Sequence, residues 1–373
     1  MHCSLSDTPF DSMSIKLICV AGARPNFMKV APIMRALSGD PTFTTVLVHT
    51  GQHYDDIMSG SFFRELGIRT PDHHLSVGSG SHAEQTAEVM KRFDPVVEAE
   101  QPHGVLVVGD VNSTMACALV ARKRQIAAIH VEAGLRSFDR NMPEEINRVV
   151  TDAISDLLLV TEESGRENLL KEGVSPERIH MVGNLMIDTL MANMERARHS
   201  AIASTLGVDR SPFGLVTLHR PSNVDDPGQL REIFETLNLI TRNIPLLFPV
   251  HPRTKARIEE SGVAPAEGLL LTEPLGYLDF LCLMARSSVV LTDSGGIQEE
   301  TTALGVPCLT LRDNTERPIT IEQGTNTLAG ASKSSILSAW EGFLRQPKRG
   351  RVPPLWDGLA AGRCLSVLKT FFI

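Results

Sequence analysis

Residues 104–123, GVLVVGDVNSTMACALVARK, contain the structural unit that repeats along this chain. The aliphatic run 104–108 predicts a buried strand, and the pattern of residues 113–123 predicts a helix. Gly109 and Asp110 lie between them, at the expected carboxyl end of the strand. Short strands that alternate with longer helices are typical of parallel sheets with crossover helices.

The unit recurs in two series along the chain. In the first we expect strands at residues 16–21, 45–49, 104–108, 127–131, 157–160 and 179–182. After a helical segment near residues 186–206, further strands are expected at 214–218, 245–250, 269–271, 289–292 and 308–311. The sequence therefore predicts an α/β protein with two Rossmann-like, doubly wound domains and a central cleft. We place these domains at residues 1–190 and 191–354, with residues 1–12 as an extension that carries no motif.

Composition restricts the possible partners and the compartment. The chain has 373 residues and a net charge of −8, from 36 Lys and Arg against 44 Asp and Glu. This balance argues against nucleic acid or an anionic membrane as a partner. The six cysteines stand singly without C-x-x-C, which favours free thiols, and no apolar run approaches the roughly 18 residues of a membrane span. The start also lacks a signal-peptide pattern, so we expect a cytoplasmic enzyme or binding protein.

Acidic side chains follow neighbouring strands of the first series. Asp110 follows the strand at 104–108, Glu132 follows the next strand, and Glu144 or Glu145 opens a helix. Because the carboxyl ends of parallel strands meet at one edge of a sheet, we expect these carboxylates to converge on the cleft. Carboxylates crowded in a partly dry cleft have raised pKa values, which suits them to proton transfer.

Cationic side chains occupy corresponding places in both series. Arg24 and Lys29 flank a helix start after the first strand, His219 and Arg220 follow the first strand of the second series, and His251 follows the next. Cations beside a helix N-terminus favour phosphate binding. We therefore expect a phosphate-bearing ligand in the cleft.

A glycine-rich stretch, DSGGIQEE at residues 293–300, follows a strand of the second series. Its glycines allow a backbone to approach a diphosphate at a helix N-terminus, and its last glutamate, one turn on, is placed to accept hydrogen bonds from ribose hydroxyls. Neither G-x-G-x-x-G nor a P-loop motif occurs, which disfavours the standard dinucleotide and triphosphate sites. The candidate nucleotide ligands here are Ser294, Gly295, Gly296, Glu300 and, from the next loop, Arg317.

Several histidines raise the possibility of a metal site, which we reject. No H-E-x-x-H motif occurs, and the closest pair straddles a turn. We expect no metal, and we interpret the glycine-rich residues 77–82 as a flexible loop over the cleft. The histidines in question are His49, His53, His73, His74 and His82.

Eight motifs together carry a family resemblance. They are GARP (22–25), KVAP (29–32), HTGQH (49–53), GD (109–110), HVEAGLR (130–136), PEEINR (143–148), DSGGIQEE (293–300) and TERP (315–318). In this order, over about residues 16–345, they resemble the non-hydrolysing UDP-N-acetylglucosamine 2-epimerase family. The resemblance implies a GT-B architecture, a homodimer, UDP held mainly by the second domain, and a helix at about 355–373 that packs back on the first.

The resemblance also implies roles for individual residues. Asp110, Glu132 and Glu144 match the family's catalytic carboxylates, and His219 matches its active-site histidine. The residues that we expect to bind substrate are Arg24, Lys29, Arg136, Arg220, His251, Phe280, Ser294, Gly295, Gly296, Glu300 and Arg317. The family's usual His-Arg-x-Glu-Asn stands here as HRPSN at residues 219–223, without the acidic member.

The implied reaction is reversible C2 epimerisation of UDP-N-acetylglucosamine to UDP-N-acetylmannosamine, through elimination and re-addition of UDP, in cell-surface polysaccharide biosynthesis. It needs no cofactor, because a 2-acetamidoglucal intermediate avoids any change of oxidation state. Variants at residues 22–25 and 51–55 keep open a hydrolysing enzyme or one acting on a modified sugar such as a UDP-2,3-diacetamido uronic acid. A GT-B glycosyltransferase and a catalytically silent nucleotide-sugar binding protein are further alternatives.

Overall fold

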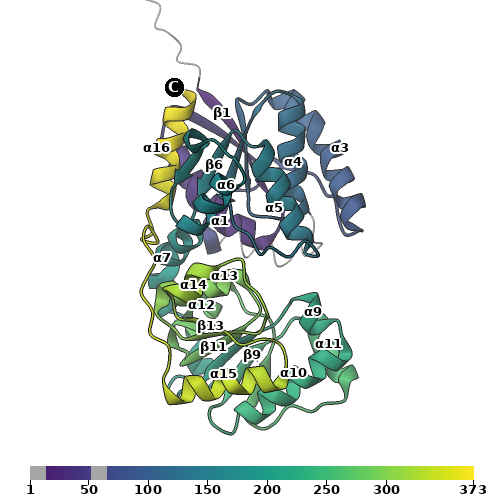
Figure 1. The fold of residues 1–373 in the computed structure, drawn as a ribbon, viewed down its shortest axis with the longest axis vertical. Coiled ribbons are helices and arrows are strands. Elements are labelled where there is room, and N and C mark those ends of the chain that lie inside the picture. The colour runs from purple at the N-terminus through teal and green to yellow at the C-terminus, as the bar shows by residue number, and fades with distance from the viewer. Residues whose placement is uncertain (1–13, 52–64) are drawn as a thin grey trace, which may run out of the picture.

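A computed structural model describes residues 14–51 and 65–373 of the chain. It contains two bodies, each a parallel sheet with helices on both faces, one above the other in Figure 1. The expected α/β class with two doubly wound sheets is confirmed.

The first sheet has seven parallel strands in the order β3-β2-β1-β4-β5-β6-β7. The strand order reverses between β1 and β4, and ligands in such sheets bind beyond the carboxyl ends of the strands at this reversal. Asp110 follows β4, and Glu132 lies near the end of β5. The strands are β1 (Ile15–Ala21), β2 (Phe43–His49), β3 (His73–His74), β4 (Gly104–Val108), β5 (Ala127–Ala133), β6 (Leu157–Val160) and β7 (Ile179–Met181).

The second sheet has six parallel strands in the order β10-β9-β8-β11-β12-β13, with its reversal between β8 and β11. His219 follows β8, and Asp293 follows β11. Both sheets therefore present polar residues at a reversal point. The strands are β8 (Gly214–Thr217), β9 (Leu246–Pro249), β10 (Leu269–Thr272), β11 (Val289–Thr292), β12 (Cys308–Thr310) and β13 (Asn326–Leu328).

Helices cover the faces of both sheets. The first body has α1 (Arg24–Ser38), α3 (His82–Glu100), α4 (Asn112–Lys123), α5 (Pro143–Ile154), α6 (Glu163–Lys171) and the 3₁₀ turn Pro176–Arg178. The second has α8 (Ile202–Thr205), α9 (Pro221–Val224), α10 (Pro227–Ile240), α11 (Pro252–Ser261), α12 (Tyr277–Arg286), α13 (Gly295–Leu304), α14 (Pro318–Glu322) and α15 (Lys333–Arg345). The sequence pattern of residues 55–66 also predicts a helix, and most of that segment lies outside the described residues.

The helix α7 (Leu185–Arg198) joins the two bodies, since it packs against α1 on one side and against α12 and α13 on the other. Its Asn184 cap donates from Nδ2 to Oε1 of Glu299 at 2.9 Å, across the domain boundary. A single apolar cluster includes Met28 from α1, Met186 from α7 and Cys282 from α12. The boundary that we expected at residue 190 falls inside this helix and stays a proposal.

The last helix, α16 (Ala360–Phe372), lies beside the first body, as the yellow ribbon in Figure 1 shows. It packs on α1, and Lys369 pairs with Asp40 at 2.5 Å. Asp188 on α7 accepts hydrogen bonds from the backbone N–H groups of Ala360 and Ala361, at 3.0 and 2.7 Å. The helix α16 therefore packs on the first body.

The glycine-rich segment at residues 77–82 leads into α3 without regular secondary structure before Ser81. The N–H groups of Val77 and Gly78 donate to the carbonyl oxygens of Thr50 and Gly51 at 3.0 and 2.8 Å. Its proposed mobility over the cleft stays a prediction.

Within residues 14–51 and 65–373, none of the helices has the length and apolar character needed to cross a membrane.

Candidate active site

Glu132 lies where the two bodies meet. It is 5% exposed, and its carboxylate pairs with Nζ of Lys29 from α1 and with Nη2 of Arg317 from the second body. The strand is bulged here, because the β5–β6 register shifts between Val131 and Ala133. Glu132 has a φ of 71°, a left-handed conformation that a non-glycine residue adopts at a cost of roughly 1–3 kcal/mol. The fold thus holds this carboxylate in a strained position between cations from two domains.

Arg317 is surrounded by carboxylates. Its Nε lies 2.8 Å from Oε1 of Glu299, and its Nη1 lies 3.8 Å from Oε1 of Glu316. Burial raises the pKa of Glu299 to about 7, although Arg317 opposes this rise. Burial also acts to raise the pKa of Glu316, but the charges of Arg317 and Arg312 outweigh it and hold that pKa far below its usual range. The carboxyl Oε2 of Glu299 is buried without a hydrogen-bond partner.

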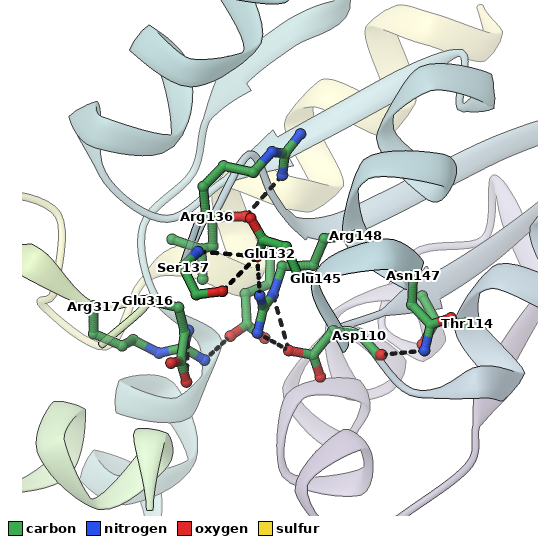
Figure 2. A network of polar contacts seen from close by, with 12 residues as sticks. Asp110, Thr114, Glu132, Arg136, Ser137, Glu145, Asn147, Arg148, Glu316 and Arg317 are labelled. Carbon is green, nitrogen blue, oxygen red and sulfur yellow. Dashed lines mark hydrogen bonds and ion pairs between the residues drawn. The ribbon is translucent and has the colours of Figure 1, made fainter. Parts of the chain in front are cut away.

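Asp110 lies in the same polar network, where Figure 2 shows Arg148 reaching both it and Glu145. Arg148 donates to Oδ2 of Asp110 from Nε at 3.0 Å and from Nη2 at 2.7 Å. Burial acts to raise the pKa of Asp110, but Arg148, Lys29 and Arg317 outweigh it and hold that pKa below its ordinary value. Asp110 is therefore ionised at neutral pH in this arrangement.

The two candidates that open α5 have different environments. Glu145 is buried and accepts from the N–H and hydroxyl of Ser137, from the N–H of Phe138 and from Arg148. It fixes the loop before α5, which is a structural role. Glu144 is half-buried and acts electrostatically on Arg220 of the second body. Glu144 therefore stays the candidate catalytic carboxylate of these two glutamates.

His219 is oriented by Asp293. The His219 Nδ1 lies 2.9 Å from Oδ1 of Asp293, and the His219 side chain is 60% exposed while that of Asp293 is fully buried. The backbone N–H groups of His219 and Arg220 and the amide of Asn223 also donate to this carboxylate. Burial acts to raise the pKa of Asp293, but the histidine and these hydrogen bonds outweigh it and lower that pKa. The pair directs Nε2 of His219 away from Asp293.

The glycine-rich stretch forms the N-terminus of α13. Ser294 is the N-cap without a side-chain capping bond. A Cβ on Gly295 would lie 2.5 Å from Oε1 of Glu316, so a side chain is not tolerated there without movement of that carboxylate. Glu300 is buried and accepts from the hydroxyl of Tyr277 at 3.0 Å. Burial raises the pKa of Glu300 to about 8, against the opposing effect of that hydrogen bond.

The remaining predicted ligands differ in how far they approach this region. Arg24 opens α1, but its side chain lies outside the described part of the structure. Phe280 is half-buried against the apolar cluster, and His251 is exposed after β9. Arg136 pairs with Asp152 at 2.7 Å and with Glu172 at 2.6 Å, which favours a structural role. A substrate contact by Arg136 stays an untested prediction.

Comparison with known proteins identifies the family. Residues 35–369 match the family model described as UDP-N-acetylglucosamine 2-epimerase. This chain belongs to the UDP-N-acetylglucosamine 2-epimerase family. It is accordingly an epimerase, as the motifs indicated.

Two proteins similar to this epimerase have different substrates in their names. The UDP-N-acetylglucosamine 2-epimerase of Methanocaldococcus jannaschii is 42% identical over 366 residues, 95% of this chain and 99% of the relative. The UDP-2,3-diacetamido-2,3-dideoxy-D-glucuronate 2-epimerase of Pseudomonas aeruginosa is 41% identical over 329 residues, 87% of this chain and 91% of the relative. A crystal structure of the Methanocaldococcus jannaschii enzyme with UDP-GlcNAc and UDP matches with a TM-score of 0.89 and 41% identity, over 95% of this chain and 100% of that chain.

Several polar residues of this epimerase were not singled out from sequence. All of them except Tyr277 lie within the quoted motifs, and Asp293 could have been recognised because it directly follows a predicted strand. The others carry no such signal, since their importance depends on partners far along the chain. They are Arg148, Tyr277, Asp293, Glu299 and Glu316.

The metal prediction can be examined only in part. Over residues 14–51 and 65–373 of this epimerase, no group of three or more His, Cys, Asp or Glu side chains is arranged to hold a metal ion. His49, His73, His74 and His82 are included in that search, whereas His53 lies outside the described residues.

Proposed function

We propose that this protein interconverts UDP-N-acetylglucosamine and UDP-N-acetylmannosamine by inverting the configuration at C2 of the sugar. The observation that carries the proposal is the position of Glu132, between Lys29 of the first domain and Arg317 of the second. A diphosphate that enters the cleft competes with Glu132 for these two cations. Binding of the leaving group would therefore release a carboxylate beside the sugar.

The first step is loss of UDP from C1. The C1–O bond breaks, the electron pair leaves with the diphosphate, and the positive charge that develops on the sugar makes the C2–H bond acidic. Arg317, His219 and the N-terminus of α13 are the groups that would stabilise the leaving diphosphate. All three belong to the second domain, so nucleotide binding and leaving-group stabilisation occur together.

The second step is proton transfer at C2. A carboxylate removes the C2 proton, the C–H electrons form the C1=C2 double bond, and 2-acetamidoglucal and UDP result. A proton then returns to C2 from the opposite face, and a diphosphate oxygen attacks C1. Inversion requires proton-transfer groups on both faces of the sugar, and we assign this role to carboxylates among Asp110, Glu132 and Glu144.

No oxidant or reductant is consumed in this sequence, and we propose that no cofactor takes part. The proton and the electron pair that leave the sugar in the elimination step return to it in the re-addition step, so the sequence can run in both directions.

A second substrate deserves a direct test, because the Pseudomonas aeruginosa relative with 41% identity is named for a UDP-2,3-diacetamido uronic acid. A uronic carboxylate needs a cation near C6 of the sugar. His251 follows β9 and Arg220 follows β8 in the second domain, and we propose them as the candidate cations for such a charge.

The test is a comparison of two substrates at equal concentration. Purified enzyme is incubated with UDP-N-acetylglucosamine or with the UDP-2,3-diacetamido uronic acid, and the products are separated by anion-exchange chromatography. We expect UDP-N-acetylmannosamine from the first. Faster epimerisation of the uronic acid would identify it as the preferred substrate. Formation of free N-acetylmannosamine and UDP would indicate hydrolysis.

We also propose that the enzyme acts as a cytoplasmic homodimer that supplies a sugar nucleotide for cell-surface polysaccharide. A nucleotide-sugar substrate and the absence of any spanning helix from the described residues support this setting. Light scattering of the purified protein tests the dimer, since a mass of one 40.7 kDa chain would contradict it.

A further inference from the structure

His130 lies in the interior of the first sheet, and the proposed reaction assigns it no role. It belongs to β5, two residues before Glu132, and its side chain is fully buried, like that of Asp152 on α5. Its Nδ1 lies 2.6 Å from Oδ1 of Asp152, and its Nε2 lies 2.8 Å from the carbonyl oxygen of Gly109. Both ring nitrogens therefore face an oxygen atom.

Both of these oxygen atoms act as hydrogen-bond acceptors. A carbonyl oxygen has no proton to donate. The carboxylate of Asp152 also accepts, through Oδ2, from the N–H of Gly134 at 3.0 Å and from Arg136 at 2.7 Å. The buried guanidinium of Arg136, paired with this carboxylate, favours its ionised form. Asp152 is therefore ionised and cannot donate to the ring.

A neutral imidazole does not fit this pair of oxygens. It carries one N–H and one lone pair, so one nitrogen would set its lone pair against an oxygen at 2.6 or 2.8 Å in a dry interior. An imidazolium supplies a proton to both. The charges of this cluster then balance, because the two cations His130 and Arg136 pair with the two anions Asp152 and Glu172.

We propose that His130 is a charged imidazolium that fixes the two loops carrying the proton-transfer carboxylates, and is thus a positioning residue for the reaction. Its Nε2–H holds the Gly109 carbonyl, directly before Asp110. Its partner Asp152 holds the N–H of Gly134, two residues after Glu132. One buried ion pair therefore restrains both loops. The inference rests on the proposed function only in assigning proton transfer to these carboxylates.

The backbone at both loops needs such restraint. Gly109, Glu132 and Gly134 have φ values of 69°, 71° and 81°, all in the left-handed region. A Cβ on Gly109 would lie 3.7 Å from Oε2 of Glu132, so the two loops adjoin. A small shift in either loop would change the distance between the carboxylates and C2, and a misplacement of about 1 Å can cost about 10²-fold in rate.

The charge state is tested by ¹⁵N NMR of histidine-labelled enzyme at pH 7.5. We expect the His130 ring, identified by its absence from the spectrum of His130→Gln, to show two protonated nitrogens with similar shifts. In Asp152→Asn we expect one protonated and one bare nitrogen, because the anion that balances the ring is gone. A neutral ring in the wild-type enzyme would overturn the proposal, whatever the substrate proves to be.

The positioning role is tested by kinetics. A glutamine at position 130 offers one N–H₂ group and no charge, so we expect His130→Gln to lower kcat by about 10–10²-fold. We expect KM to change less than threefold, because the groups proposed to hold the diphosphate, Arg317, His219 and the N-terminus of α13, lie in the other domain. The matched control is His180→Gln, at a partly exposed histidine on β7, for which we expect the wild-type kcat. A folded His130→Gln enzyme with the wild-type kcat would overturn the positioning role.

Discussion

Replacing Arg148 by methionine should raise the pKa of Asp110 and move the acid limb of the activity profile to higher pH. Arg148 is 2% exposed and donates twice to one carboxylate oxygen of Asp110, which is 27% exposed. Because Asp110 must be ionised to accept a proton, activity falls as the pH drops through its pKa. A higher pKa therefore brings this loss at a higher pH.

The size of the shift follows from the geometry. Two unit charges about 4 Å apart attract by about 332/(20 × 4), or about 4 kcal/mol, at an effective dielectric constant of about 20. At about 1.4 kcal/mol per pKa unit this corresponds to about three units at most. Lys29 and Arg317 still act on Asp110 in the variant, so we expect the acid limb to move upward by about 1–3 units.

The assay is kcat as a function of pH, measured by chromatography of the two epimers. Arg148→Lys is the matched control, because it keeps the positive charge, and we expect its limb to move by less than about one unit. Glu145 keeps its donors Ser137 and Phe138 in both variants. Circular dichroism confirms that each variant is folded. An acid limb of Arg148→Met that coincides with the wild-type limb would refute the role of ionised Asp110.

Three further changes test other parts of the site. Glu132→Gln should lower kcat by about 10²–10⁴-fold, because the proton acceptor is lost. Calorimetry should show undiminished UDP binding, because the cations Lys29 and Arg317 remain. Weaker UDP binding would contradict this. Asp293→Asn should lower kcat by about tenfold or more through misorientation of His219, and wild-type kcat would count against the pair. The pKa of Glu300 is raised from 4.5 to about 8 in the folded protein. Between these two pH values the native state keeps a proton that the unfolded chain has lost, so the free energy of unfolding should fall as the pH rises from about 5 to 8. Urea unfolding should show this fall in the wild-type protein and a less steep one in Glu300→Gln.

Much of the fold could be predicted because its signals are local. The pattern of residues 82–100 predicts a helix, and α3 spans His82–Glu100, with Ser81 and Glu84 forming a capping box at its start. The strand β13 at Asn326–Leu328 was missed, since three residues with one apolar side chain make no pattern. The two-residue strand β3 was missed for the same reason.

The site could be predicted only in part, because its geometry depends on contacts between distant residues. Glu132 and Arg317 are 185 positions apart, and nothing in either motif indicates that they pair across the domain boundary. The role of Arg136 stays a prediction. The family motif HVEAGLR indicates substrate binding, and the structure adds that its guanidinium pairs with Asp152 and Glu172.

The central claim is that carboxylates at this cleft exchange the proton at C2 of a UDP-sugar. It is tested most directly by ¹H NMR of UDP-N-acetylglucosamine incubated with the enzyme in D₂O. We expect the C2 proton signal to disappear from both the remaining substrate and the UDP-N-acetylmannosamine formed, as solvent deuterium replaces it. UDP-N-acetylmannosamine that retains its C2 proton, or a substrate left unchanged, would contradict the claim.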